Sequence, residues 1–222
     1  EPYPTFNYTR LENLFDALSS QGITQIQGSV IGDESRYDAE RFTPSLGLGI
    51  KGTEVGPLGA LMVNDGVITG NPIKPDNPAL GAATEFSNTL QNNGISVSGV
   101  PRVGIAPQEL TVIAKIDSLP LSDIVAEMLT NSDNNTAELL VKELGFASTG
   151  VGTREAGLEV MKAKLVEWGI PLDALTFVDG SGLDRGNRLT CSSLSALLAK
   201  DGGFGPAGFG LAIAGQTGTL RD

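Results

Sequence analysis

A short polar segment between two amphipathic patterns constrains the fold of this 222-residue chain more than any other feature. Apolar residues recur every three or four positions before it, at Leu121, Ile124, Val125, Met128 and Leu129, and after it, at Ala137, Leu140, Val141 and Leu144. This spacing predicts helices over residues 121–131 and 135–144, the second ending at Gly145. The segment between the two patterns, Thr130–Glu138, carries hydroxyl, carboxylate and amide side chains.

The polar segment has two interpretations. Asn135 followed by Glu138 has the form of a capping box, which would make the segment a plain helix joint. Alternatively, Ser132-Asp133-Asn134 has the form of a catalytic Ser-Asp-Asn triplet, and a tight turn between helices would be a rigid place to present its hydroxyl and its amide. Both can hold at once, and the rest of the chain must decide between them.

Composition removes several classes of function. The chain has no His, which excludes Ser-His-Asp triads, Cys-His dyads and most zinc sites, so we predict neither metal nor cofactor. Acid–base chemistry must then use carboxylates, Lys, or hydroxyls near Lys. A net charge of −11 without a basic patch disfavours binding to nucleic acid or to anionic membranes. The single Cys191 is predicted to be a buried thiol at a helix start.

Other stretches complete the predicted element list. Helices are expected over residues 8–21, 78–92, 153–168 and 190–200, and strands over 23–32, 60–67, 95–100, 111–116 and 175–178. Residues 33–58 are expected to be irregular. One supersecondary unit, a helix followed by Gly-Ile and a strand, occurs twice, over 11–31 and 80–100. Gly47–Gly52 matches the letters of a dinucleotide loop, but it lacks the flanking strand and helix and is expected to be a surface loop. No apolar run reaches the length of a membrane span.

Three fragments in order resemble one family. Ser132-Asp133-Asn134 comes first, Asp179-Gly180-Ser181-Gly182-Leu183 second, and Gln216-Thr217-Gly218-Thr219-Leu220 third, where a Lys-Thr-Gly box would stand. Together they are similar to the class C low-molecular-mass penicillin-binding proteins, the serine D-alanyl-D-alanine carboxypeptidases/endopeptidases of the bacterial envelope. Segments 28–33 and 61–66 also resemble the region that this family inserts into its catalytic domain.

The resemblance implies an α+β fold of the serine β-lactamase/transpeptidase type, an antiparallel sheet flanked by helices. Residues 1–110 would be the inserted accessory α/β region, and 111–222 part of the catalytic domain. The family's Ser-x-x-Lys, which holds the nucleophile and its base, does not occur in this sequence. We therefore expect a mature or truncated chain that lacks segments at both ends.

The resemblance also implies roles for single residues. Ser132 would relay a proton, Asn134 would hold the substrate amide, and Gln216, Thr217, Gly218 and Thr219 would line a strand edge that receives the peptide. Gln216 replaces a Lys, which predicts weaker capture of substrate or penicillin because a neutral bond is weaker than a charge-assisted one. Ser181 has no base within sequence reach and is interpreted as a turn residue.

The implied partners are the D-Ala-D-Ala peptide of peptidoglycan and β-lactam inhibitors, in an extracytoplasmic location. A non-catalytic envelope homologue that binds peptidoglycan or a partner protein is the alternative, favoured by Gln216 and by the absence of Ser-x-x-Lys. A β-lactamase is a third possibility, less favoured because the first half resembles the carboxypeptidase insert.

Overall fold

The computed structural model describes residues 8–71 and 73–200, which contain helices and a few short strands and so belong to the α+β class. They form two compact units. The first takes in the described residues up to Phe42 and those of Lys51–Pro120, and the second takes in Thr43–Ile50 and the described residues from Leu121 onward. No helix among the described residues is long and apolar enough to cross a bilayer.

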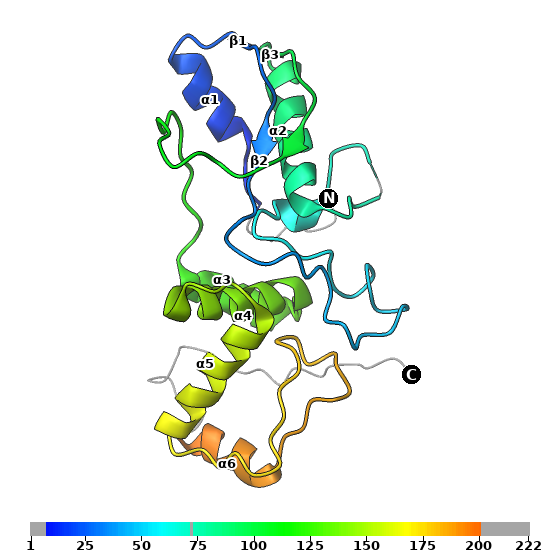
Figure 1. Cartoon of the computed structure of the whole chain (residues 1–222), viewed down its shortest axis with the longest axis vertical. Coiled ribbons are helices and arrows are strands. Elements are labelled where there is room, and N and C mark those ends of the chain that lie inside the picture. The colour runs from blue at the N-terminus through cyan, green and yellow to red at the C-terminus, as the bar shows by residue number, and fades with distance from the viewer. Residues whose placement is uncertain (1–7, 72, 201–222) are drawn as a thin grey trace. The chain divides into compact units, whose positions relative to one another are not determined.

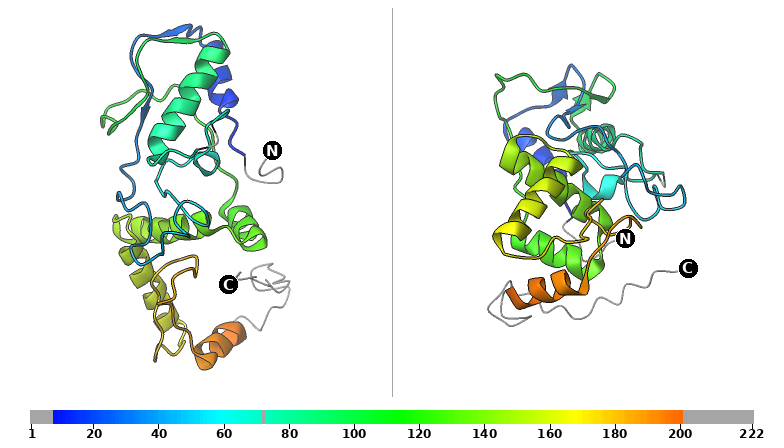
Figure 2. Two further views of the ribbon diagram at one scale, coloured as in Figure 1. Left: turned by 90° about the vertical axis from the view of Figure 1, so that its right-hand side faces the viewer. Right: turned by 60° about the horizontal axis from the view of Figure 1, so that its bottom comes forward.

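The first unit is built from the predicted repeat. Helix α1 (Glu12–Ser20) leads to strand β1 (Gln25–Ile26), and helix α2 (Pro78–Asn92) leads to strand β3 (Ser96–Val97), which pairs with β1 in parallel. A second parallel pair follows, between β2 (Ile31–Gly32) and β4 (Arg102–Val103). Figures 1 and 2 show α2 beside these strands. The two halves of the repeat therefore lie strand against strand.

The core of this unit sits where each helix turns into its strand. Leu18, Leu90 and Ile95 are buried, and Phe15, Phe86 and other half-buried apolar side chains pack against them. Gly22 and Gly94 end the two helices in left-handed conformations, which glycine adopts without steric cost. The predicted order of a helix, a Gly-Ile pair and a strand is confirmed in both copies.

Several predicted strands are wrong or too long. Residues 60–67 form no strand: they contain a 3-10 turn, η1 (Asn64–Gly66), in which Asn64 and Asp65 take positive φ. Residues 111–116 form no strand either, since nothing among the described residues pairs with them. Of 175–178 only a single bridge remains, between Thr176 and Arg188. The strands of 23–32 and 95–100 shrink to two-residue pieces, and 33–58 is irregular as predicted.

The second unit is helical. It contains α3 (Leu121–Asn131), α4 (Asn134–Thr149), α5 (Arg154–Glu167) and α6 (Cys191–Lys200). The predicted stop at Gly145 is wrong: α4 continues to Gly150, whose φ of 77° ends it. The prediction of a buried Cys191 is also wrong, since its thiol is on an exposed residue in the first turn of α6.

Gly145 is needed for packing instead. A Cβ at Gly145 would lie 2.8 Å from the nitrogen of Gly157, and a Cβ at Gly157 would lie 1.8 Å from the carbonyl oxygen of Val141. Glycines on both helices therefore let α4 and α5 approach until their backbones touch. This close approach fixes the position of α4, the helix that follows the Ser-Asp-Asn triplet.

Gly157→Ala is expected to lower the free energy of unfolding by about 1–3 kcal/mol, because the new methyl would overlap a backbone oxygen that cannot move alone. The control is the reverse exchange, Ala163→Gly, at an exposed position of the same helix. It changes helix propensity alone and should lower the free energy of unfolding by about 0.5–1 kcal/mol. Urea unfolding followed by circular dichroism compares them. A Gly157→Ala variant as stable as the unmodified chain would contradict the close-packing argument.

Candidate functional site

Ser132 lies in the two-residue joint between α3 and α4. Its φ is 57°, in the left-handed region, and its side chain is exposed. The next N–H, of Asp133, donates a 3.0 Å hydrogen bond to the carbonyl oxygen of Met128. This bond, from the second residue past the helix end to a carbonyl five residues earlier, is a standard closure of a helix C-terminus.

Three other helix ends in the described part of the chain close with the same bond. It joins Ile23 to Leu18, Ile95 to Leu90 and Ile170 to Leu165. In these three the left-handed residue is a glycine: Gly22, Gly94 and Gly169. A left-handed conformation costs a residue with a Cβ about 1–2 kcal/mol. Ser132 therefore occupies a position where the backbone favours glycine, and its hydroxyl is presented at the cost of local strain.

Asp133 begins the next helix. Its Oδ1 accepts the N–H groups of Asn135 and Thr136 at 3.0 and 3.2 Å, and its Oδ2 accepts the hydroxyl of Thr136. The predicted capping box of Asn135 and Glu138 is therefore wrong: the cap is Asp133, and Asn135 is a buried residue inside α4. One residue thus closes α3 with its N–H and caps α4 with its carboxylate. Asn134, the first residue of α4, is half-buried.

The side chain of Glu138 makes a long-range contact instead of a capping box. It is 1% exposed, and its Oε1 accepts the N–H groups of Gly180 and Ser181 at 3.1 and 2.9 Å. Burial raises the pKa of this carboxyl, against the opposing effect of the hydrogen bonds from Ser181 and Gly180, and the negative charge of Asp179 raises it further. Lys142, one turn later on the same helix, is also buried. Glu138 therefore connects the first motif's helix to the second motif.

The second motif is a loop organised around Asp179. This carboxylate is 3% exposed and accepts the N–H of Gly182 at 2.8 Å, the N–H of Asp184 at 2.6 Å and the side-chain amide of Asn187 at 2.7 Å. Asn187 also accepts the N–H of Val178 at 2.8 Å. Ser181 accepts a long 3.4 Å bond from the N–H of Leu183, which agrees with its interpretation as a turn residue.

A segment distant in sequence reaches the same loop. The hydroxyl of Ser45 donates to Asp184, which also accepts the N–H of Gly186 at 2.6 Å. The bond from Ser45 is the main reason that the pKa of the Asp184 carboxyl lies below its usual value. On the other side, Arg154 of α5 donates to the carbonyl of Val178 at 2.9 Å. The loop is therefore held at several points.

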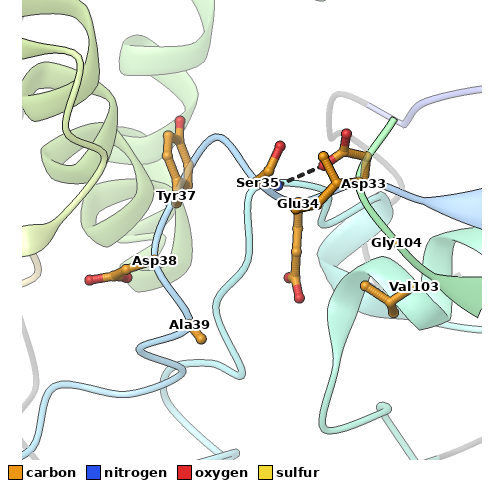
Figure 3. Close-up of a pocket in the computed structure, with 9 residues that line it drawn as sticks. Asp33, Glu34, Ser35, Tyr37, Asp38, Ala39, Val103 and Gly104 are labelled. Atoms are coloured by element: carbon orange, nitrogen blue, oxygen red, sulfur yellow. Dashed lines mark hydrogen bonds between the residues drawn. The ribbon is translucent and has the colours of Figure 1, made fainter. Parts of the chain in front are cut away.

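The first unit contains a shallow cavity of about 220 Å³ (Figure 3). Its acidic residues already have partners: Asp33 accepts the N–H groups of Ser35 and Ala106, and Glu34 binds Arg41. Among the residues that the structure describes, no group of three or more His, Cys, Asp or Glu side chains is arranged to hold a metal ion. The remaining predicted site residues, Gln216, Thr217, Gly218 and Thr219, lie outside the described residues.

The sequence is similar to one protein family over most of its length. Residues 69–222 match the model of the D-Ala-D-Ala carboxypeptidase 3 (S13) family. The chain belongs to this family. It is 37% identical to a D-alanyl-D-alanine carboxypeptidase of Actinomadura sp. over 130 residues, which cover 57% of this chain and 24% of that protein. It is 27% identical to carboxypeptidase DacB of Mycolicibacterium smegmatis over 222 residues, covering 96% of this chain and 47% of the relative.

The family's fold is also found by structural comparison. The chain superposes on the crystal structure of penicillin binding protein 4 (dacB) from Haemophilus influenzae with a TM-score of 0.71 at 20% sequence identity. The match covers 84% of this chain and 56% of that one, which shows a shared fold. The chain spans about half the length, or less, of the relatives it matches.

Three residues that organise the site belong to the predicted motifs, but the sequence pattern did not predict the role of any of them. Asp133 carries the cap, Glu138 holds the second motif, and Asp179 orders the loop. The cap could have been found, because Asp is as good a cap as Asn. The contact of Glu138 joins residues more than 40 positions apart and leaves no local signal.

Ser132→Gly is expected to raise the free energy of unfolding by up to about 1 kcal/mol, because relief of the left-handed strain exceeds the extra chain entropy of glycine. Gly94→Ala is the matched control: its φ is 95° and no atom lies within 4 Å of the added carbon, so only backbone strain changes. That control should lose about 1 kcal/mol or more. Thermal and urea unfolding measure both, and a Ser132→Gly variant less stable than the unmodified chain would argue against strain at this joint.

Glu138→Gln is expected to raise stability at pH 7–8. The raised pKa means that the folded state binds the proton more tightly than the unfolded state, so ionisation opposes folding. This penalty is present above the folded pKa and disappears below the ordinary glutamate value of about 4.3. The gain over the unmodified chain should therefore shrink between pH 7 and pH 4. Urea midpoints across this range test it, with exposed Glu12→Gln as the control that follows the unmodified chain.

Proposed function

We propose that this chain is the part of a serine D-alanyl-D-alanine carboxypeptidase/endopeptidase that carries the Ser-Asp-Asn motif. The observation that carries the proposal is the exposed hydroxyl of Ser132 at a left-handed helix joint. Three equivalent joints use glycine, so the fold alone gives no reason for a hydroxyl here. Membership of the S13 family and the similarity to a D-alanyl-D-alanine carboxypeptidase support the same reaction class.

In the proposed reaction the nucleophile is the Ser of a Ser-x-x-Lys motif that these 222 residues do not contain. Its oxygen attacks the carbonyl of the D-Ala-D-Ala bond, the terminal D-Ala leaves as an amine, and water then hydrolyses the acyl-enzyme. Ser132 relays the proton between the nucleophile's Lys and the leaving nitrogen. Asn134, two positions later at the start of α4, holds the substrate amide.

The third motif supplies the substrate-binding strand in this proposal. Gln216, Thr217, Gly218 and Thr219 form an edge that pairs with the extended peptide through its main chain. The N–H of Thr219 is one oxyanion donor, a role typically worth about 10²–10³ in rate. Gln216 donates a neutral hydrogen bond where a Lys would add charge, so the substrate carboxylate and β-lactams are held more weakly.

The finer architecture is part of the same proposal. Residues 111–222 contribute to a transpeptidase-like domain with an antiparallel sheet, and residues 1–110 are an accessory insert. The division of the described residues into two units and the fold shared with penicillin binding protein 4 support this arrangement. A D-Ala-D-Ala substrate places the protein outside the cytoplasm, at the peptidoglycan.

The test is intact-mass measurement after incubation with benzylpenicillin. The full-length gene product should gain one penicilloyl mass, and the 222-residue chain should gain none. In the full-length protein, Ser132→Gly keeps the joint and removes the hydroxyl, so acylation should slow by about 10²–10⁴, the usual contribution of acid–base catalysis. Ser122→Ala, an exposed hydroxyl of α3, is the control and should acylate normally.

Each contrary result has a clear meaning. An adduct on the 222-residue chain would show that the nucleophile lies within it. A full-length protein that takes up no penicillin would favour the alternative, a non-catalytic envelope protein, which Gln216 in place of a Lys also favours. Unchanged acylation in Ser132→Gly would remove the relay role.

A further inference from the structure

Glu138 joins the two motif segments through its buried carboxylate, which also accepts a hydrogen bond from the side chain of Ser181. Its Oε1 accepts two consecutive N–H groups, those of Gly180 and Ser181, so the carboxylate clamps the loop backbone. A carboxylate is an expensive choice for this position, because it is 1% exposed and burial disfavours its charge. Charge-assisted bonds are roughly twice as strong as neutral ones, which makes the clamp stiffer than an amide clamp would be.

The loop backbone lies directly on α4 at this point. A Cβ at Gly180 would be 2.7 Å from the carbonyl oxygen of Ala137 and 2.6 Å from Cγ2 of Val141. Steric contact therefore sets the distance between loop and helix. The two hydrogen bonds to Glu138 add a directional constraint, which resists rotation of α4 about its axis and sliding along it.

The constraint acts on the face of α4 that begins with the triplet. Asn134 and Glu138 are four residues apart, which places them on the same side of the helix, about 6 Å apart along its axis. Any rotation of α4 that displaced Glu138 from the loop would turn Asn134 by the same angle. Asp133 couples the movement to Ser132, since it caps α4 and closes α3.

We propose that Glu138 is a positioning residue for the acyl-transfer reaction, which fixes Ser132 and Asn134 by clamping α4 to the 179–183 loop. The proposal rests on the proposed function for the reaction itself, but the clamp is a property of the fold. Loss of the acceptor, not loss of charge alone, should release the joint. Glu138→Ala removes the acceptor, whereas Glu138→Gln keeps an oxygen that can accept both N–H groups.

The experiment uses the full-length gene product with Glu138→Ala, Glu138→Gln and a control, Leu90→Ala. Leu90 is a buried residue of α2 in the core of the first unit, so its truncation lowers stability without changing the helix that carries the clamp. Two quantities are measured: the second-order rate of acylation by benzylpenicillin, and amide hydrogen exchange of a peptide covering residues 128–136. The temperature is kept well below the melting points of all variants.

Glu138→Ala should exchange the 128–136 amides at least several-fold faster and acylate about 10–100-fold more slowly, since a misplacement near 1 Å can cost about 10² in rate. Glu138→Gln should keep both the exchange and the acylation close to those of the unmodified protein, and Leu90→Ala should change neither despite its lower stability. Unchanged exchange in Glu138→Ala overturns the clamp, and acylation equal to that of Leu90→Ala overturns its role in the reaction. If the unmodified protein takes up no penicillin, the proposed function and the reaction role fail together, while exchange still decides the clamp.

Discussion

The joint at Asp133 is the interaction on which the rest of the site depends. Its N–H closes α3 on Met128, and its carboxylate caps α4 through Asn135 and Thr136. Because one residue serves both helix ends, the connection is too short to rearrange. The residue before Asp133 must therefore adopt a left-handed backbone conformation. Ser132 is that residue. A longer linker would let a serine avoid this strain, but it would also let the hydroxyl move.

The second unit satisfies its buried carboxylates mainly with backbone N–H groups. Glu138 binds two, Asp179 binds two as well as the amide of Asn187, and Asp184 binds Gly186 and the hydroxyl of Ser45. Buried charge needs such partners to be tolerated. Backbone donors have a consequence that a Lys or Arg partner would not have, because they fix the course of the chain itself. The 179–187 loop is thereby shaped without regular secondary structure.

The helices and their ends were predictable because the signals are local. Apolar residues at helical spacing specify the buried face of each helix, and the glycines at 22, 94 and 169 specify where a helix ends. Both signals come from residues that are close together in the sequence. The predicted helix end at Gly145 was wrong because a glycine can serve packing as well as termination. A Cβ at Gly145 would lie 2.8 Å from the nitrogen of Gly157, so this glycine is required by packing. The strands failed because pairing is not local. Val112 and Ile113 have strand-like side chains but remain exposed, since no described segment pairs with them.

The role of Glu138 depends on a long-range contact that a local sequence pattern does not contain. Asn135 and Glu138 fit a capping box, but Asp133, two positions earlier, is an equally good cap residue. In the structure the carboxylate of Asp133 takes the cap, and Glu138 instead binds the N–H groups of Gly180 and Ser181. The same long-range contact gives the two motifs a physical relation that their order in the sequence cannot express. A motif set is then more than a signature: the second member holds in place the helix that presents the first.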